Sequence, residues 1–157
     1  MHYICQNATG IIGTSHRQLE YGLSFAGRAK NDNDEVFPHG YFSRKLSAEK
    51  TADATRWWKE KGIKEDAFVC CFFGTIGKFF DLTTVIKAAE ILSKEFSIQI
   101  VLCGNGSGFK KYQKMAASVD SVYLPGWVDG PKITGLMQLS HVGLAPYAAS
   151  SKTENSQ

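Results

Sequence analysis

From about residue 67 onward, the pattern of apolar and polar positions alternates between segments typical of strands and segments typical of helices. The continuous apolar run 67–74 (AFVCCFFG) ends in glycine and predicts a strand that is buried on both faces, and 97–104 (SIQIVLCG) predicts a second buried strand that also ends in glycine. Between them, 81–96 (DLTTVIKAAEILSKEF) has apolar residues at helical spacing, so one face of a helix is expected to pack on these strands. That face consists of Leu82, Val85, Ile86, Ala89, Leu92 and Phe96.

The alternation of strand and helix continues to about residue 147. The pattern predicts a helix over 107–118 with Ser107 as a candidate N-cap, and then a short strand over 121–126. A helix over 130–140, with Pro131 in its first turn, and a strand over 141–147 follow. A βαβαβαβ succession predicts a parallel sheet with right-handed crossovers, and hence the α/β class.

The first part of the chain follows a different pattern. A strand is predicted over 9–15 and a helix over 16–27, and because one strand and one helix cannot make a core, this piece must pack on something else. A further helix is predicted over 47–62, with Ser47 as a candidate N-cap and Gly62 as a candidate C-cap.

Composition narrows the classes of function. With 157 residues, 43% of them hydrophobic, the chain can form one compact domain or parts of two. Its net charge of +3 is spread without a long basic block, so no nucleic-acid partner is expected. No apolar stretch approaches the ~18 residues that span a bilayer, and the first residues lack the pattern of a signal peptide. We therefore expect a soluble protein that is not exported.

No metal site is predicted. The four cysteines lack paired metal-ligand spacing, and three of them lie inside apolar runs, which predicts buried, reduced thiols. His16, His39 and His141 are far apart in the sequence, so we interpret each as structural rather than catalytic.

The candidate chemistry lies where the strands end. In parallel α/β sheets, ligands bind outside the carboxyl ends of the strands, and three such ends carry glycine here: 74–80, 104–107 and 125–130. Glycine lets backbone N–H groups approach an anion, and Lys78 adds a positive charge. Asp81 opposes an anion unless it serves as a helix N-cap. An ordinary strand-to-helix turn with a surface lysine is the alternative interpretation of 74–80.

Other local motifs are weak or missing. The stretch GNGSG (104–108) is only superficially similar to the dinucleotide-binding fingerprint, because its third glycine falls at the wrong spacing. The sequence contains no nucleophile elbow and no kinase-type lysine motif.

Taken in order, several stretches resemble the family-four glycosyltransferases of the GT-B architecture, in which two Rossmann-like domains face each other across a cleft. They are GIIGTSHRQLEYGL, VFPHGY, FFGTIGKFFDLTTVIKAAEIL, IQIVLCGNG and VYLPGWVDGPKITGLMQLSHVGLAPY. The resemblance runs from about Ala8 to Tyr147. It implies that 1–40 is the end of the N-terminal, acceptor-side domain with the crossover, and that 41–66 is a linker and helix. Residues 67–157 are then a partial C-terminal Rossmann-like domain that binds the nucleotide sugar.

The resemblance also implies roles for individual residues. The donor is expected at seven residues of two loops. Gly74, Thr75, Gly77 and Lys78 lie near its diphosphate, with Lys78 matching the family's phosphate lysine, and the turn of Gly104, Asn105 and Gly106 lines the nucleotide side. The base is expected at the backbone of Trp127 and Val128. Members of the family often have arginine where this chain has Thr75, so one of two usual positive charges is missing.

A pair of glutamates eight positions apart contacts the donor in this family. Glu154 lies near the first position, and the second would fall at 162, beyond the last residue of the sequence. We therefore expect a fragment of a longer enzyme that is inactive alone. Apart from Glu154, no catalytic residue is assigned.

The implied activity of the parent protein is transfer of a sugar from a nucleotide-diphosphate donor to an acceptor hydroxyl, in glycan or polysaccharide biosynthesis, with no obligatory metal and no other cofactor. The implied partners are the nucleotide sugar and a glycan or lipid-linked acceptor. The implied location is the cytoplasm, with the inner face of the membrane left open through peripheral association of the parent. Two alternatives remain open: a GT-B nucleotide-sugar epimerase or hydrolase, and a non-catalytic nucleotide-binding module.

Overall fold

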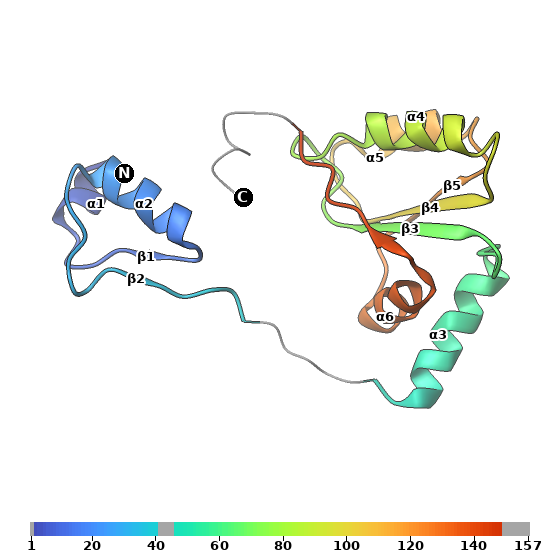
Figure 1. Cartoon of the computed structure of the whole chain (residues 1–157), viewed down its shortest axis with the longest axis horizontal. Coiled ribbons are helices and arrows are strands. Elements are labelled where there is room, and N and C mark those ends of the chain that lie inside the picture. Colours follow the sequence, from blue (N-terminus) through green and yellow to red (C-terminus); the bar gives the residue numbers. More distant parts are fainter. Residues whose placement is uncertain (1, 41–45, 149–157) are drawn as a thin grey trace. The chain divides into compact units, whose positions relative to one another are not determined.

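The computed structural model describes residues 2–40 and 46–148, which form two compact units (Figure 1). The first unit holds the described residues up to 40, and the second holds residues 46–148. Residues 41–45, part of the predicted crossover and linker, lie outside the described residues, as does Glu154.

A four-stranded parallel sheet forms the centre of the second unit. Its strands are β3 (Phe68–Phe73), β4 (Ile98–Cys103), β5 (Val122–Gly126) and β6 (Val142–Gly143), in the order β5-β4-β3-β6. Every neighbouring pair is parallel, which confirms the predicted sheet. The last strand is shorter than predicted, because only Val142 and Gly143 pair with β3.

Helices cover both faces of this sheet, as Figure 1 shows. Helices α4 (Leu82–Leu92) and α5 (Phe109–Ala116) lie on one face, and α3 (Ala48–Glu60) and α6 (Gly130–Leu139) lie on the other. Successive side chains of β3 enter opposite cores: Cys70 packs toward α4 and Cys71 toward α3. This burial on both faces explains why the strand is a continuous apolar run.

Close contact between α3 and α6 makes α3 part of the second unit. A Cβ atom at Gly135 would lie 2.8 Å from the Cβ atom of Ala54, so the two helices approach closely at this point. Trp58 is fully buried, and its indole N–H donates to the carbonyl oxygen of Lys132 at 2.7 Å. The adjacent Trp57 is half-buried and meets Trp58 edge-on. The predicted cap Ser47 accepts from the N–H of Lys50, whereas the C-cap is Lys61, one residue before the predicted Gly62.

The predicted apolar face of 81–96 is only partly correct. Leu82, Val85, Ile86 and Ala89 are buried as expected. Leu92 and Phe96 are exposed, Phe96 by 60%, because α4 ends at Leu92 and the chain continues in tighter turns. Past the end of the helix, the helical spacing no longer directs Phe96 to the sheet.

The first unit contains α1 (His2–Asn7), β1 (Ile12–Gly13), α2 (His16–Ala26) and β2 (Glu35–Val36), and its two strands pair in parallel. The prediction of one strand and one helix was incomplete, because it omitted α1 and β2. Helix α2 begins where predicted, and the side chain of Ser15 caps it by accepting from the N–H of Gln18.

One buried carboxylate, Asp34, holds the first unit together. Asp34 is only 1% exposed, and its carboxylate oxygens accept from the backbone N–H groups of Ile11 and Asn31, each at 2.7 Å. The guanidinium of Arg28 donates to both oxygens, at 2.7 and 2.8 Å. These hydrogen bonds, led by that of Arg28, hold the pKa of Asp34 well below its usual range.

We predict that Asp34→Asn loosens the first unit. The amide offers one acceptor oxygen in place of two, and its NH2 group faces the Arg28 donors. The N–H groups of Ile11 and Asn31 should therefore exchange faster with deuterium at neutral pH. Since the pKa of Asp34 is depressed in the folded state, the stabilisation is present above the pKa of an unfolded Asp, about 3.9, and is lost as the pH falls below it.

Asp32→Asn is the matched control, because Asp32 is an exposed carboxylate two residues away. If the Ile11 amide exchanges with deuterium at the same rate in wild type and in Asp34→Asn, the Asp34 carboxylate does not hold the backbone at Ile11 in place.

Candidate functional site

The loops that follow β3 and β4 are joined by backbone hydrogen bonds. The N–H of Gly74 donates to the carbonyl of Cys103 at 3.1 Å, and the N–H of Ile76 donates to Asn105 at 3.0 Å. In return, the N–H of Gly108 donates to the carbonyl of Ile76 at 2.9 Å. The pairing of the two strands thus continues past their carboxyl ends and fixes both loops.

Two glycines make this loop contact possible. Gly104 has φ +142°, and a Cβ atom there would lie 1.8 Å from the carbonyl oxygen of Gly74. Gly106 has φ +155°, and a Cβ atom there would lie 2.4 Å from the oxygen of Ile76. Both therefore have a structural reason to be glycine, and neither by itself indicates a ligand.

Gly77 is different. It is not among the glycines with positive φ, and a Cβ atom there would meet only the hydroxyl of Ser107 at 3.8 Å. Among the described residues, no hydrogen bond uses the N–H groups of Gly77 and Lys78. Lys78 is exposed and forms no ion pair within the described ranges. The apex of the loop, Gly77–Lys78, is therefore free to meet a ligand.

The far side of the same loop is also held. The N–H of Asp81 donates to the carbonyl of Pro146 at 2.7 Å, and the rings of Phe80 and Tyr147 lie 5.0 Å apart. The backbone is therefore held by hydrogen bonds on both sides of the apex.

The start of α4 is already occupied by a carboxylate. Asp81 is the N-cap, and its side chain accepts from the N–H groups of Thr83 and Thr84 and from the hydroxyl of Thr84. These hydrogen bonds, led by that of the Thr84 hydroxyl, lower the pKa of Asp81. Asp81 therefore fills the positive end of α4 itself.

The start of α5 has no such side chain. The predicted N-cap, Ser107, was wrong: Gly108 holds the N-cap position, and it makes no side-chain hydrogen bond. The hydrogen bond from Gly108 to the β3 loop fixes where the helix begins, one residue later than the sequence suggests. No side chain therefore competes for the N-terminal donors of α5.

A hollow of ≈ 310 Å³ lies at the carboxyl ends of β3 and β4, next to the turn that follows β5. Six predicted site residues line it: Gly74, Thr75, Gly104, Asn105, Trp127 and Val128. The other three predicted residues, Gly77, Lys78 and Gly106, do not line it and lie on the loops beside it.

Three further lining residues, Phe73, Cys103 and Ile133, were not predicted. Phe73 and Cys103 are the last residues of β3 and β4, directly before the glycines, and that position was the available signal. Burial raises the pKa of the Cys103 thiol to about 12, so it stays protonated near neutral pH and is not a nucleophile.

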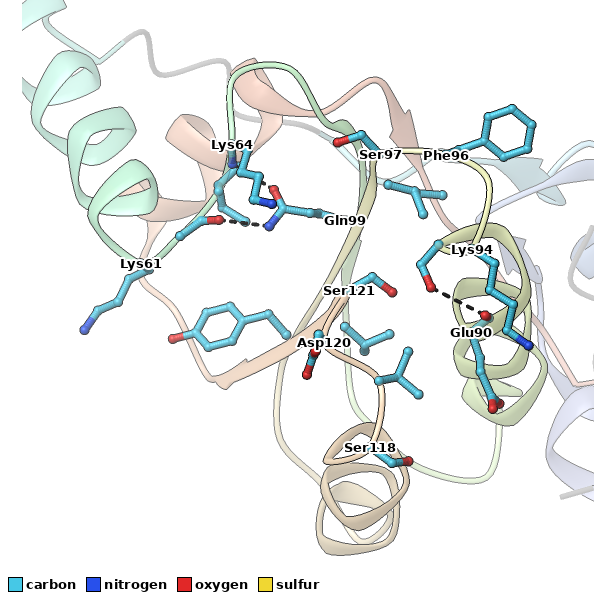
Figure 2. Close-up of a pocket in the computed structure, with 17 residues that line it drawn as sticks. Lys61, Lys64, Glu90, Lys94, Phe96, Ser97, Gln99, Ser118, Asp120 and Ser121 are labelled. Carbon is cyan, nitrogen blue, oxygen red and sulfur yellow. Dashed lines mark hydrogen bonds between the residues drawn. The ribbon is translucent and has the colours of Figure 1, made fainter.

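A larger hollow, of ≈ 800 Å³, lies at the opposite, amino ends of β4 and β5 (Figure 2). Gln99 closes part of it by donating to the carbonyl of Gly62 and accepting from the N–H of Lys64, both at 2.8 Å. The lysines do not converge: Lys61 and Lys94 point away from each other, and the Lys61 ammonium lies over the Trp57 ring. Because ligands of parallel α/β sheets bind at the carboxyl ends, the smaller hollow is the candidate site.

Of the predicted structural histidines, His141 lies in the second unit: its Nδ1 accepts from the N–H of Val69 at 3.1 Å between β6 and β3, a structural role as predicted. His16 and His39 are exposed residues of the first unit. Within residues 2–40 and 46–148, no group of three His, Cys, Asp or Glu side chains is placed to hold a metal ion. The metal-free chemistry implied by the sequence stays a prediction. In the same ranges, no helix has both the length and the apolar content to cross a membrane.

The cysteines agree with their prediction: Cys70, Cys71 and Cys103 are free and buried, and Cys5 is free and partly buried.

Comparison with known proteins finds similarity in structure alone. No family model and no curated protein matches the chain. HepE of Anabaena, solved with UDP-glucose, matches with a TM-score of 0.65 and 17% identity over 87% of this chain and 37% of HepE. WaaG, a glycosyltransferase involved in lipopolysaccharide biosynthesis, matches with a TM-score of 0.67 and 14% identity over 87% of this chain and 37% of WaaG. TarM matches with a TM-score of 0.61 and 16% identity over 96% of this chain and 28% of TarM.

These matches confirm the predicted fold. The chain has the α/β, Rossmann-like fold of GT-B glycosyltransferase structures, and it spans well under half of their length. The division into 1–40, 41–66 and 67–157 and the roles of the site residues stay predictions.

We predict opposite outcomes for two glycine substitutions in the loops. Gly104→Ala should lower the free energy of unfolding by about 2 kcal/mol or more, because its Cβ atom collides with the backbone of Gly74 and its φ is unfavourable. Gly77→Ala should change it by less than about 0.5 kcal/mol, because the space is open. Urea unfolding followed by circular dichroism measures both.

Equal destabilisation by the two substitutions would contradict the distinction between a structural glycine and a free loop apex.

Proposed function

We propose that this chain forms the donor-binding part of a glycosyltransferase that transfers a sugar from a nucleotide-diphosphate donor to an acceptor hydroxyl, in glycan or polysaccharide biosynthesis. One observation carries the proposal. Six predicted site residues from the β3 and β4 loops and the turn after β5 line a single hollow, and the free apex Gly77–Lys78 lies on one of those loops. The complex of HepE with UDP-glucose supports the choice of ligand class.

The diphosphate is assigned to the side of the β3 loop. Lys78 supplies a full positive charge, and the free N–H groups of Gly77 and Lys78 supply donors. Ser107 lies close to Gly77 at the start of α5, whose N-terminal donors face no capping side chain. The start of α4 contributes little, because the carboxylate of Asp81 already fills it.

The nucleoside is assigned to the hollow. Its volume lies at the lower end of the range for small-molecule pockets, about 300–1,000 Å³. Its lining is mostly apolar, with Thr75 and Asn105 as polar side chains and the backbone at Trp127 and Val128 on the base side.

The chemistry follows from this placement. The bond between the sugar carbon and the diphosphate oxygen breaks, and its electron pair stays on the departing diphosphate. The acceptor oxygen bonds to the sugar carbon and gives up its proton to a base. Lys78 and the loop donors stabilise the negative charge of the leaving group, which supplies most of the acceleration without a metal ion. Glu154 stays a predicted donor contact outside the described residues.

The remaining parts of the proposal concern the parent protein. Its acceptor is a glycan or a lipid-linked glycan. It acts in the cytoplasm, and on a lipid-linked acceptor it works at the inner face of the membrane.

We predict that Lys78→Ala weakens binding of UDP to the chain by roughly tenfold or more. Hydrogen bonds to charged groups contribute about 1.5–3 kcal/mol, which corresponds to a factor of at least ten. Isothermal titration calorimetry at low salt measures the change. Added salt should reduce the difference in UDP affinity between wild type and Lys78→Ala, because it screens the charge of the exposed lysine.

Lys87→Ala is the matched control, since Lys87 is an exposed lysine on α4 away from the loop. An unchanged UDP affinity in Lys78→Ala would remove Lys78 from the phosphate site, and an equal loss in both variants would reduce its role to net charge.

A further inference from the structure

Five exposed lysines lie on the outer layer that helices α4 and α5 form. This layer, the α4–α5 face, consists of the two helices and the turns that follow them, residues 82–96 and 109–118. The helices pack side by side on one face of the sheet (Figure 1). Within the residues that the structure describes, none of the five lysines forms an ion pair. They are Lys87, Lys94, Lys110, Lys111 and Lys114.

The α4–α5 face carries an excess of positive charge. Its carboxylates are Glu90 and Glu95, two against five lysines, and α5 itself has none. The excess equals the formal net charge of the whole chain, +3, so the acidic and basic residues elsewhere in the sequence balance. The sequence shows no basic block because these lysines come from two segments that only the fold brings together.

Large apolar side chains are exposed among these lysines. Ile91 is 65% exposed and Phe96 is 60% exposed. Ile91 lies one helical turn after Lys87 on the surface of α4, and its carbonyl accepts from the N–H of Lys94 at 3.3 Å. Figure 2 shows the Phe96 ring projecting away from the other labelled side chains. Lysines and exposed apolar groups are therefore interspersed on one surface, as at sites of interaction.

We propose that the α4–α5 face docks the chain on an anionic lipid surface. The ammonium groups attract the anionic headgroups, and Ile91 and Phe96 enter the boundary between headgroups and acyl chains. Lysine suits this position, because its apolar stem can lie along the lipid while its charge stays in water. Because the docking requires no nucleotide, it goes beyond the proposed function and does not rest on it.

The composition of the face favours lipid over protein or nucleic acid. Protein interfaces are enriched in arginine, tyrosine and tryptophan and depleted in lysine. Here lysine is the basic residue throughout, and the tyrosine of the face, Tyr112, is buried. A nucleic-acid backbone would meet the lysines through its phosphates but would leave Ile91 and Phe96 in water. A lipid surface accommodates both the charge and the apolar side chains.

Co-sedimentation of the full 157-residue chain with lipid vesicles tests the docking. At low salt, the chain should bind vesicles of equal parts phosphatidylglycerol and phosphatidylcholine at least about tenfold more tightly than vesicles of phosphatidylcholine alone. Lys110→Gln combined with Lys114→Gln should weaken binding to the mixed vesicles about 20-fold, because each lysine near an anionic surface contributes a factor of about five. Salt at about 0.5 M should weaken binding too, since it screens the charges.

Ile91→Ser combined with Phe96→Ser tests the entry of the apolar side chains. This variant should bind the mixed vesicles at least about tenfold more weakly, because the apolar area that leaves water is lost. Both residues are exposed, and thermal unfolding checks that the fold is kept.

Lys50→Gln combined with Lys61→Gln is the matched control. It makes the same change in charge at two exposed lysines of α3 and its C-cap, on the other face of the sheet, and should change vesicle binding by less than about twofold.

Three outcomes would contradict the proposal. Absence of binding to the mixed vesicles at low salt would overturn it and leave an acidic protein as the partner that the face fits. An equal loss in the α5 variant and the α3 control would reduce the effect to net charge. Unchanged binding in the serine variant would contradict the entry of Ile91 and Phe96 into the lipid. Each of these outcomes leaves the proposed function intact, because the UDP titration of Lys78→Ala is a separate measurement.

Discussion

The candidate site depends on the contact between the backbones of the loops after β3 and β4. Gly104 and Gly106 allow this contact, because any side chain at either position would collide with the neighbouring loop. The contact fixes the buried Ile76 and sets the start of α5 through Gly108. It leaves the apex Gly77–Lys78 as the part of the β3 loop whose N–H groups are unused within the described chain. A structural constraint thus produces an ordered set of free donors.

The two helices that begin at this edge differ in charge. Asp81 brings its carboxylate to the start of α4, which neutralises the positive end of that helix. Helix α5 begins at Gly108 without a capping side chain, so its end stays positive. In the proposed function, with Thr75 where the family often has arginine, the diphosphate is attracted mainly by Lys78, by loop N–H groups and by the start of α5. Its binding should respond strongly to each of these few groups.

The sequence predicted those parts of the fold in which the residues of an element are buried in the same way along its length. Strands β3 and β4 contribute side chains to the cores on both faces of the sheet, so their apolar sequences were clear. The two-residue strands β1, β2 and β6 exist only through their partners, and no local pattern marks their limits. The glycine positions of the site were also evident. Their different reasons were not, because only the folded chain shows that Gly104 meets a carbonyl oxygen and Gly77 meets open space.

The strand order also gives the candidate site a direction. Trp127 follows β5 and Lys78 follows β3, with β4 between them. Neighbouring strands lie about 4.8 Å apart, so these two ends are separated by roughly 10 Å, a distance that an extended nucleoside diphosphate spans. In the proposed function, a donor with its base on the side of Trp127 and its diphosphate at Lys78 therefore runs across the sheet edge from β5 to β3. Beyond β3 the remaining neighbour in the sheet is β6, on the side where Pro146 and Tyr147 hold the loop, so this is the side that the proposed arrangement leaves for the sugar.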